Sequence, residues 1–194
     1  VPIQGRWGAV WGSSADSVWV VGGGKQALHW NGRAWKSVAL PEESALVGLW
    51  GSGPKDIWAI GAGGEALHWD GASWTASESG VKGPLAAIWG SSASDIWAVG
   101  GEERRKYRGK RVDVEREAIA IHWNGKAWSR VELPAKWPLT DIWGSSASSV
   151  WAVGNAGVLL HWDGKAWRTE GETHNTSNFI WGSGDDDLWS GGIT

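Results

Sequence analysis

The chain of 194 residues contains no cysteine and no methionine, and it has only one tyrosine and one phenylalanine. The absence of cysteine excludes disulfides and thiolate metal sites. The formal net charge of −3 is too small to indicate nucleic acid or an anionic membrane as a partner. No apolar run reaches the roughly 20 residues of a membrane-spanning helix. What remains is a chain of ordinary length for one domain.

Tryptophan, by contrast, is abundant: the chain has 20 of them, and most fall in a tandem pattern. The pattern opens with Trp-Gly-Ser, and a second Trp follows eight residues after the first. The pairs are Trp11 and Trp19, Trp50 and Trp58, Trp89 and Trp97, Trp143 and Trp151, and Trp181 and Trp189. Four copies continue into His-Trp-(Asn/Asp)-Gly-x-x-Trp, at His29 to Trp35, His68 to Trp74, His122 to Trp128 and His161 to Trp167. A period near 40 residues is typical of radial or stacked repeats.

One repeat shows the expected strands. Leu46 to Trp50 and Ile57 to Ile60 are short apolar runs bounded by glycine, and Ala66 to Trp69 precedes the turn pair Asp70-Gly71 and a strand around Trp74. Four antiparallel strands in about 39 residues form a propeller blade. The sequence therefore predicts an all-β fold with almost no helix: a single β-propeller domain over residues 1–194, built of four-stranded antiparallel blades.

The blade count predicted from the spacing is four full repeats and the first half of a fifth. Three arrangements would complete the fifth blade. A longer parent chain continues at one or both ends, or residues 1–5 supply a closing strand, or a second chain completes the ring. An open half-blade would otherwise leave an unpaired strand edge, which folded β proteins avoid.

The tryptophans have two interpretations. A buried Trp hides about 150–250 Å², which stabilises the fold by roughly 4–6 kcal/mol at most, so packing between blades is the first interpretation. The second applies to the outermost set, whose rings would stack on a sugar or a proline if they were exposed. These residues are Trp35, Trp74, Trp128 and Trp167.

The repeated polar residues also favour structural roles. A blade-by-blade histidine is spread around the ring, whereas a metal needs several ligands at one point, so we expect the histidines to pack or to bond a neighbouring blade. Asp56, Asp95 and Asp187 share their slot with Ser17 and Ser149, which indicates a side-chain oxygen that caps the preceding turn. We expect no metal, no cofactor and no catalytic residues.

The third repeat alone carries an insertion, within residues 102–117, that has seven positive and five negative side chains. Gly109 lies near its middle, and Val112 and Val114 alternate with acidic residues, so we expect an extended hairpin between the second and third strands. One interpretation is a solvated ribbon of mutually paired charges. The other is a contact for an acidic partner, made by Arg104, Arg105, Lys106, Tyr107, Arg108, Lys110 and Arg111.

The segments Trp89 to Gly100 (WGSSASDIWAVG) and His161 to Trp167 (HWDGKAW) resemble the tryptophan-rich tandem repeats of secreted or surface proteins from myxobacteria. They are more distantly similar to kelch repeats, although the hairpin between the aromatic residues is shorter here. The resemblance covers the chain except the insertion. It implies a bacterial β-propeller at the cell surface or outside the cell, and it transfers no catalytic residue.

Together these observations predict a non-catalytic recognition or assembly module with a protein partner. A glycan-binding propeller that uses the outer tryptophans is the alternative, and it requires exposed indole rings. A glycan hydrolase or lyase is the weakest interpretation, because it needs non-repeating acids and bases gathered at one face of the ring.

Overall fold

The computed structural model describes residues 6–172 and 176–192. Residues 1–5, one of the expected sources of a closing strand, lie outside the described residues. The all-β prediction is confirmed: the described helical structure is one short 3-10 turn, η1 (Asn155–Gly157). No helix in the described part of the chain is long and apolar enough to cross a bilayer.

Sixteen strands follow one another along the described residues. They are β1 (Trp7–Ser14), β2 (Ser17–Trp30), β3 (Trp35–Gly53), β4 (Asp56–Gly61), β5 (Ala66–Trp69), β6 (Trp74–Ser77), β7 (Leu85–Ser92), β8 (Asp95–Arg108), β9 (Arg111–Trp123), β10 (Trp128–Arg130), β11 (Leu139–Ser146), β12 (Ser149–Gly154), β13 (Val158–Trp162), β14 (Trp167–Glu172), β15 (Phe179–Gly184) and β16 (Asp187–Gly191).

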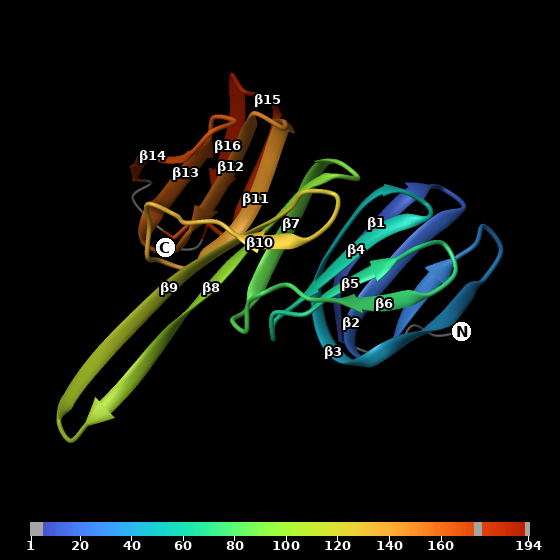
Figure 1. The fold of residues 1–194 in the computed structure, drawn as a ribbon, viewed down its shortest axis with the longest axis horizontal. Coiled ribbons are helices and arrows are strands. Elements are labelled where there is room, and N and C mark those ends of the chain that lie inside the picture. Colours follow the sequence, from blue (N-terminus) through green and yellow to red (C-terminus); the bar gives the residue numbers. More distant parts are fainter. Residues whose placement is uncertain (1–5, 173–175, 193–194) are drawn as a thin grey trace.

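The strands pair in antiparallel meanders that follow the sequence repeats (Figure 1). The third repeat forms a four-stranded sheet from β7 to β10, and the fourth forms another from β11 to β14. The first and second repeats share one sheet, because β3 runs without a break from the last strand of one into the first strand of the next. β15 and β16 form a two-stranded sheet.

Among the described residues, three apolar cores lie between consecutive repeats. Each core combines the second strand of one repeat with several strands of the next, as when Trp58 and Ile60 meet Leu85, Ile96 and their neighbours. β4 is buried along nearly its whole length, which agrees with the continuous apolar character of Ile57 to Ile60. Stability therefore comes from pairs of neighbouring repeats.

The second tryptophan of a repeat is the centre of each core. Trp58 is 2% exposed, and its ring lies 4.6 Å from the ring of Trp123 and 5.2 Å from that of Trp128, which it meets edge-on. Both partners belong to the His-Trp-x-Gly-x-x-Trp hairpin of the next repeat. Trp19 contacts Trp69 and Trp74, and Trp97 contacts Trp162 and Trp167, in the same way.

The glycine of Trp-Gly-Ser is explained by the first tryptophan of the preceding repeat. A methyl group at Gly51 would lie 2.8 Å from Trp11 Cη2, and one at Gly90 would lie 2.8 Å from Trp50 Cζ2. The same crowding recurs at Gly144 against Trp89, at 2.7 Å. A side chain at these positions would collide with an indole ring. The motif therefore places a tryptophan of one repeat against a glycine of the next.

Replacing Trp58 by Ala should lower the free energy of unfolding by about 3–5 kcal/mol, because the substitution empties a closed aromatic site. Equilibrium unfolding in urea, followed by circular dichroism, measures this change. Tyr107→Ala removes an aromatic ring that is 72% exposed and is the matched control, with an expected change within about 0.5 kcal/mol. An unchanged unfolding midpoint for Trp58→Ala would contradict the packing.

Replacing Gly90 by Ala should destabilise the chain by about 1–3 kcal/mol, because the new methyl group overpacks the contact with Trp50. Gly53→Ala is the control, since no atom lies within 4 Å of a methyl group there. The same unfolding measurement separates the two variants. Equal midpoints would show that the glycine serves backbone freedom rather than the close approach of the indole.

Candidate functional site

The insertion is a long two-stranded ribbon that projects from the third repeat (Figure 1). β8 and β9 pair without a register shift from Ile96↔Trp123 to Arg108↔Arg111. At its exit from the sheet, Gly101 has φ of +135°, and a methyl group there would lie 2.1 Å from the Glu117 carbonyl oxygen. Gly109, with φ of +64°, is the first of two turn residues, as type II′ hairpin turns prefer.

One face of the ribbon, which we call the charged face, carries paired ions. Its residues are Glu102, Arg104, Lys106, Arg108, Arg111, Asp113, Glu115 and Glu117. Lys106 Nζ lies 2.7 Å from Glu115 Oε1, and Arg104 pairs with Glu102. These contacts lower the pKa of Glu115, chiefly through the Lys106 hydrogen bond, and raise the pKa of Arg104 through Glu102. Much of the expected cationic surface is therefore neutralised within the ribbon.

The tip retains excess positive charge. Asp113 is shared by Arg111, at 2.8 Å, and Arg108, at 3.4 Å. Lys110 occupies the turn between these two arginines and is exposed. The end of the ribbon thus carries Arg108, Lys110 and Arg111 beside one carboxylate, which pairs with the two arginines, so the excess positive charge of the insertion lies at its outermost point.

The opposite face, which we call the apolar face, exposes hydrophobic side chains to solvent. Tyr107 is 72% exposed, Val112 45% and Val114 38%. Tyr107 pairs across the strands with Val112, and Arg105 with Val114, so all four side chains point the same way. Arg105 is held by Glu103 at 3.0 Å.

The base of the ribbon is braced on the same face. Arg116 donates to Glu103 at 2.9 Å, and its guanidinium carbon lies 3.8 Å from the centre of the Trp137 ring. The arginine contacts hold the pKa of Glu103 below its usual value, first through Arg105 and then through Arg116. A groove of about 340 Å³ runs beside the base between Arg116 and the segment from Arg130 to Lys136. Trp137 lies outside the repeat, so its contact with Arg116 could not be predicted from the sequence.

The outer tryptophans are packing residues at three of their four positions. Trp74 is 5% exposed, and Trp128 and Trp167 are 7% exposed; Trp35 is half-buried. These three rings are buried because each one packs against the second tryptophan of the preceding repeat. The glycan interpretation therefore loses the exposed indole faces that it requires at these positions.

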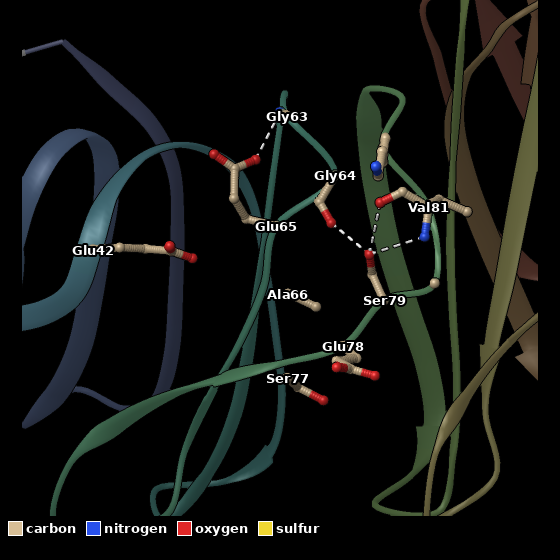
Figure 2. A pocket seen from close by; sticks show the side chains of 11 residues that line it. Glu42, Gly63, Gly64, Glu65, Ala66, Ser77, Glu78, Ser79 and Val81 are labelled. Carbon is tan, nitrogen blue, oxygen red and sulfur yellow. Dashed lines mark hydrogen bonds between the residues drawn. The ribbon is translucent and has the colours of Figure 1, made fainter.

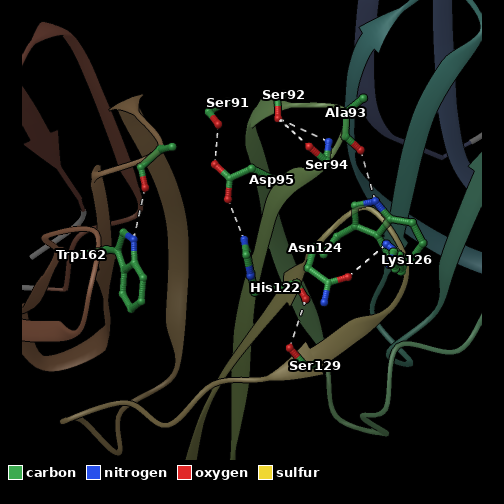
Figure 3. Close-up of polar contacts among 12 residues, drawn as sticks. Ser91, Ser92, Ala93, Ser94, Asp95, His122, Asn124, Lys126, Ser129 and Trp162 are labelled. Atoms are coloured by element: carbon green, nitrogen blue, oxygen red, sulfur yellow. Dashed lines mark hydrogen bonds and ion pairs between the residues drawn. The ribbon is translucent and has the colours of Figure 1, made fainter.

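The repeated histidines bond within their own sheet rather than to a neighbouring blade, as Figure 3 shows for His122. His122 Nε2 lies 2.6 Å from Asp95 Oδ1, and its ring lies 4.4 Å from that of Trp97. Ser91 donates to the other oxygen of Asp95. The aspartate thus contacts two side chains, which corrects the expectation that it caps turn backbone. In this repeat it also separates Ser91 from His122.

The same arrangement recurs in the second repeat, where His68 Nε2 lies 2.6 Å from Asp56 Oδ1. In the first and fourth repeats a serine takes the aspartate's place, and His29 and His161 lie 3.2 Å from Ser17 and Ser149. Burial, followed by nearby Lys36, lowers the pKa of His29. The described residues bring no three histidine, aspartate or glutamate side chains together as a metal site.

A second candidate is an open pocket of about 450 Å³ beside the turns before β5 and after β6 (Figure 2). Its most buried polar side chain, Ser79, donates to the Gly64 carbonyl at 2.6 Å and accepts from the Val81 amide at 3.3 Å. Glu65 accepts from the Gly63 amide at 2.6 Å. These groups already hold the two turns together, so the pocket is a by-product of turn structure.

The sequence matches no protein-family model and no curated protein. Solved structures do match. YCF48 from Cyanidioschyzon merolae aligns with a TM-score of 0.63 and 16% identity, over 97% of this chain and 67% of that one. A structure of YCF48 bound to D1 peptide aligns with a TM-score of 0.68 and 15% identity, over 98% of this chain and 61% of that one. Nearly all of this chain thus shares the fold of YCF48, a β-propeller, and it spans 61–67% of the length of these two YCF48 chains.

Replacing Asp95 by Ser should cost little stability, because Ser17 and Ser149 already bond the equivalent histidines. Asp95→Ala should cost about 1–2 kcal/mol, since it leaves the half-buried His122 ring nitrogen without its partner. Urea unfolding of both variants near neutral pH tests the difference. Equal losses would mean that the histidine is held by the stack on Trp97 alone.

Proposed function

We propose that the chain is a non-catalytic protein-interaction module and that the projecting hairpin is its contact element. One observation carries the proposal. The ribbon stays paired in register to its tip, and it holds Tyr107, Val112 and Val114 on one face with their side chains in solvent. Exposed apolar side chains grouped on a preformed arm are typical of a protein contact.

The charges of the ribbon describe the partner. Because the tip carries Arg108, Lys110 and Arg111 and only Asp113 pairs with the arginines there, the tip attracts carboxylates, and the adjacent apolar face accepts aliphatic or aromatic side chains. The partner surface is therefore a protein segment that combines acidic and apolar residues. The proposed contact therefore involves the tip and Tyr107 rather than all the basic residues that the sequence suggested.

Two further observations support this class of function. YCF48, which shares the fold, has been solved with D1 peptide bound, so a protein with this architecture binds a polypeptide. The repeated histidines and aspartates of this chain bond one another or serine, which supports structural roles for them rather than acid–base chemistry.

The proposal includes the parent architecture and its location. The five Trp-Gly-Ser units are the blades, or parts of blades, of one propeller, with four full repeats and half of a fifth in this chain. The resemblance to tryptophan-rich surface proteins supports a place outside the cytoplasm. Fractionation of cells that make the tagged protein tests the location.

Shortening the ribbon should remove binding and leave the fold intact. In the variant, Asn-Gly replaces residues 105–114, so that Arg104 and Glu115 flank a two-residue turn and the Arg116 contact with Trp137 remains. The probe is a set of peptides selected from a random library on the immobilised native chain. We expect these peptides to combine acidic and apolar residues and to bind more weakly as salt rises.

Tyr107→Ser should weaken the binding of these peptides by about tenfold or more, as the removal of an anchoring aromatic residue does. Fluorescence anisotropy measures the affinity. Trp189→Ser, which removes an exposed ring far from the ribbon, is the matched control. Peptides that bind the shortened chain as tightly as the native one would refute the role of the hairpin. Substrate turnover abolished by a single acid or histidine substitution would refute a non-catalytic module.

A further inference from the structure

Both long edges of the projecting ribbon are open beyond the sheet (Figure 1). On the outer side of β8, the last backbone hydrogen bond within the described part of the chain runs from the Gly101 amide to the Pro84 carbonyl oxygen, at 2.9 Å. On the outer side of β9, the last one runs from the Val131 amide to the Ala120 carbonyl oxygen, also at 2.9 Å. From these points to the turn, each arm pairs only with the other among the described strands.

The register determines which backbone groups face the open edge of β8. Backbone groups of successive strand residues point to alternate sides. The Gly101 amide points away from β9, and Arg108 points toward β9 because it pairs with Arg111 across a two-residue turn. The residues whose backbone groups point outward are therefore Glu103, Arg105 and Tyr107. Each offers one donor and one acceptor, so this edge is a template for another strand.

The side chains along the β8 edge alternate in chemistry. Tyr107 lies on the apolar face, whereas Arg104, Lys106 and Arg108 form a row on the charged face. These three cations pair with carboxylates of the ribbon, but their side chains remain 61%, 54% and 75% exposed. A strand laid against β8 would meet apolar side chains on one face and cations on the other. A segment in which acidic and apolar residues alternate matches both faces at once.

The β9 edge has the opposite charge. Because Ala120 points toward β10, the outward backbone groups of β9 include those of Val112 and Val114. The charged face beside them carries three carboxylates, on Asp113, Glu115 and Glu117. This edge would repel an acidic segment. It would also compete for the β8 edge of a second copy, although Arg111 in the same row makes it a poorer match than a wholly acidic row.

We propose that the partner segment binds as an added strand on the open edge of β8, with its acidic residues beside Arg104, Lys106 and Arg108 and its apolar residues beside Tyr107. This inference rests on the proposed function and specifies the edge, the extended conformation and the alternating chemistry of the partner. Strand addition is a general mode of peptide recognition, in which main-chain hydrogen bonds give affinity and alternate side chains give specificity. The ribbon becomes three-stranded when it is occupied.

Amide hydrogen exchange followed by NMR tests the edge, with the library-selected peptides as probes. Saturating peptide should slow the exchange of the outward amides of Arg105 and Tyr107 by about tenfold or more, because these amides then bond the peptide backbone. The outward amides of Val112 and Val114 on β9 are the internal control and should keep their rates. Protection that includes the β9 amides, or that spares Arg105 and Tyr107, would overturn the proposal.

Proline substitutions on the two edges give a matched pair. Arg105→Pro removes an outward N–H from β8, and Val114→Pro removes one from β9 directly across the ribbon. Both amides face solvent, so both variants should keep the native unfolding midpoint. Only Arg105→Pro should weaken the binding of the peptides, by about tenfold or more. Arg105→Ala loses the guanidinium but keeps the amide, so it should bind nearly as tightly as the native chain.

The outcomes separate strand addition from the proposed function. Peptides that fail to bind the shortened chain but bind Arg105→Pro as tightly as the native chain would overturn strand addition and leave the hairpin contact standing. A library that yields no binding peptide, or peptides that bind the shortened chain equally well, would refute both. Protection of the β8 amides that arises without peptide and increases with protein concentration would assign this edge to a second copy instead.

Discussion

The fold depends on one contact, the insertion of a second-strand tryptophan into the aromatic hairpin of the following repeat. Trp58 meets Trp123 and Trp128 at ring distances near 5 Å, and edge-to-face pairs of this kind add about 0.5–1.5 kcal/mol beyond the area they bury. The other side chains between these two sheets are mostly smaller and aliphatic, such as Ile60, Leu85 and Ile96. Removing the indole therefore removes both the largest buried surface and the element that fixes the spacing between two sheets.

This dependence explains why other residues of the repeat are small or polar. The Trp-Gly-Ser glycine provides the space into which the preceding indole projects, and the Asp-Gly or Asn-Gly turn places two tryptophans as cross-strand partners, such as Trp69 and Trp74. The histidine stacks on the inserted indole from within its own sheet. Each part of the motif therefore serves the same contact from a different side.

The all-β fold, the order of the strands and the site of the hairpin were predictable from sequence, because spacing, glycine and turn chemistry act locally. The partners of His122 were not, since its bond to Asp95 depends on the register of β8 and β9. The Arg116 contact with Trp137 was equally hidden, because it joins the insertion to a loop outside the period. The continuity of β3 through two repeats also depends on tertiary packing rather than on a local signal.

The candidate site divides in the same way. The charge of the insertion was visible in the sequence, but the distribution of that charge required the register, which sets Lys106 beside Glu115 and leaves Asp113 between two arginines. The alternation of Val112 and Val114 with acidic residues indicated a ribbon with two unlike faces. Only the pairing of Tyr107 with Val112 joined these residues into one apolar face.

The unbroken register of the ribbon has a consequence for how this protein can change over generations. Because β8 and β9 remain paired beyond the sheet, residues gained or lost symmetrically about Gly109 in steps of two on each arm would keep every side chain on its present face. The length and chemistry of the arm are thus separable from the tryptophan core. The length and surface of the ribbon can therefore change while the repeats beneath it stay unaltered.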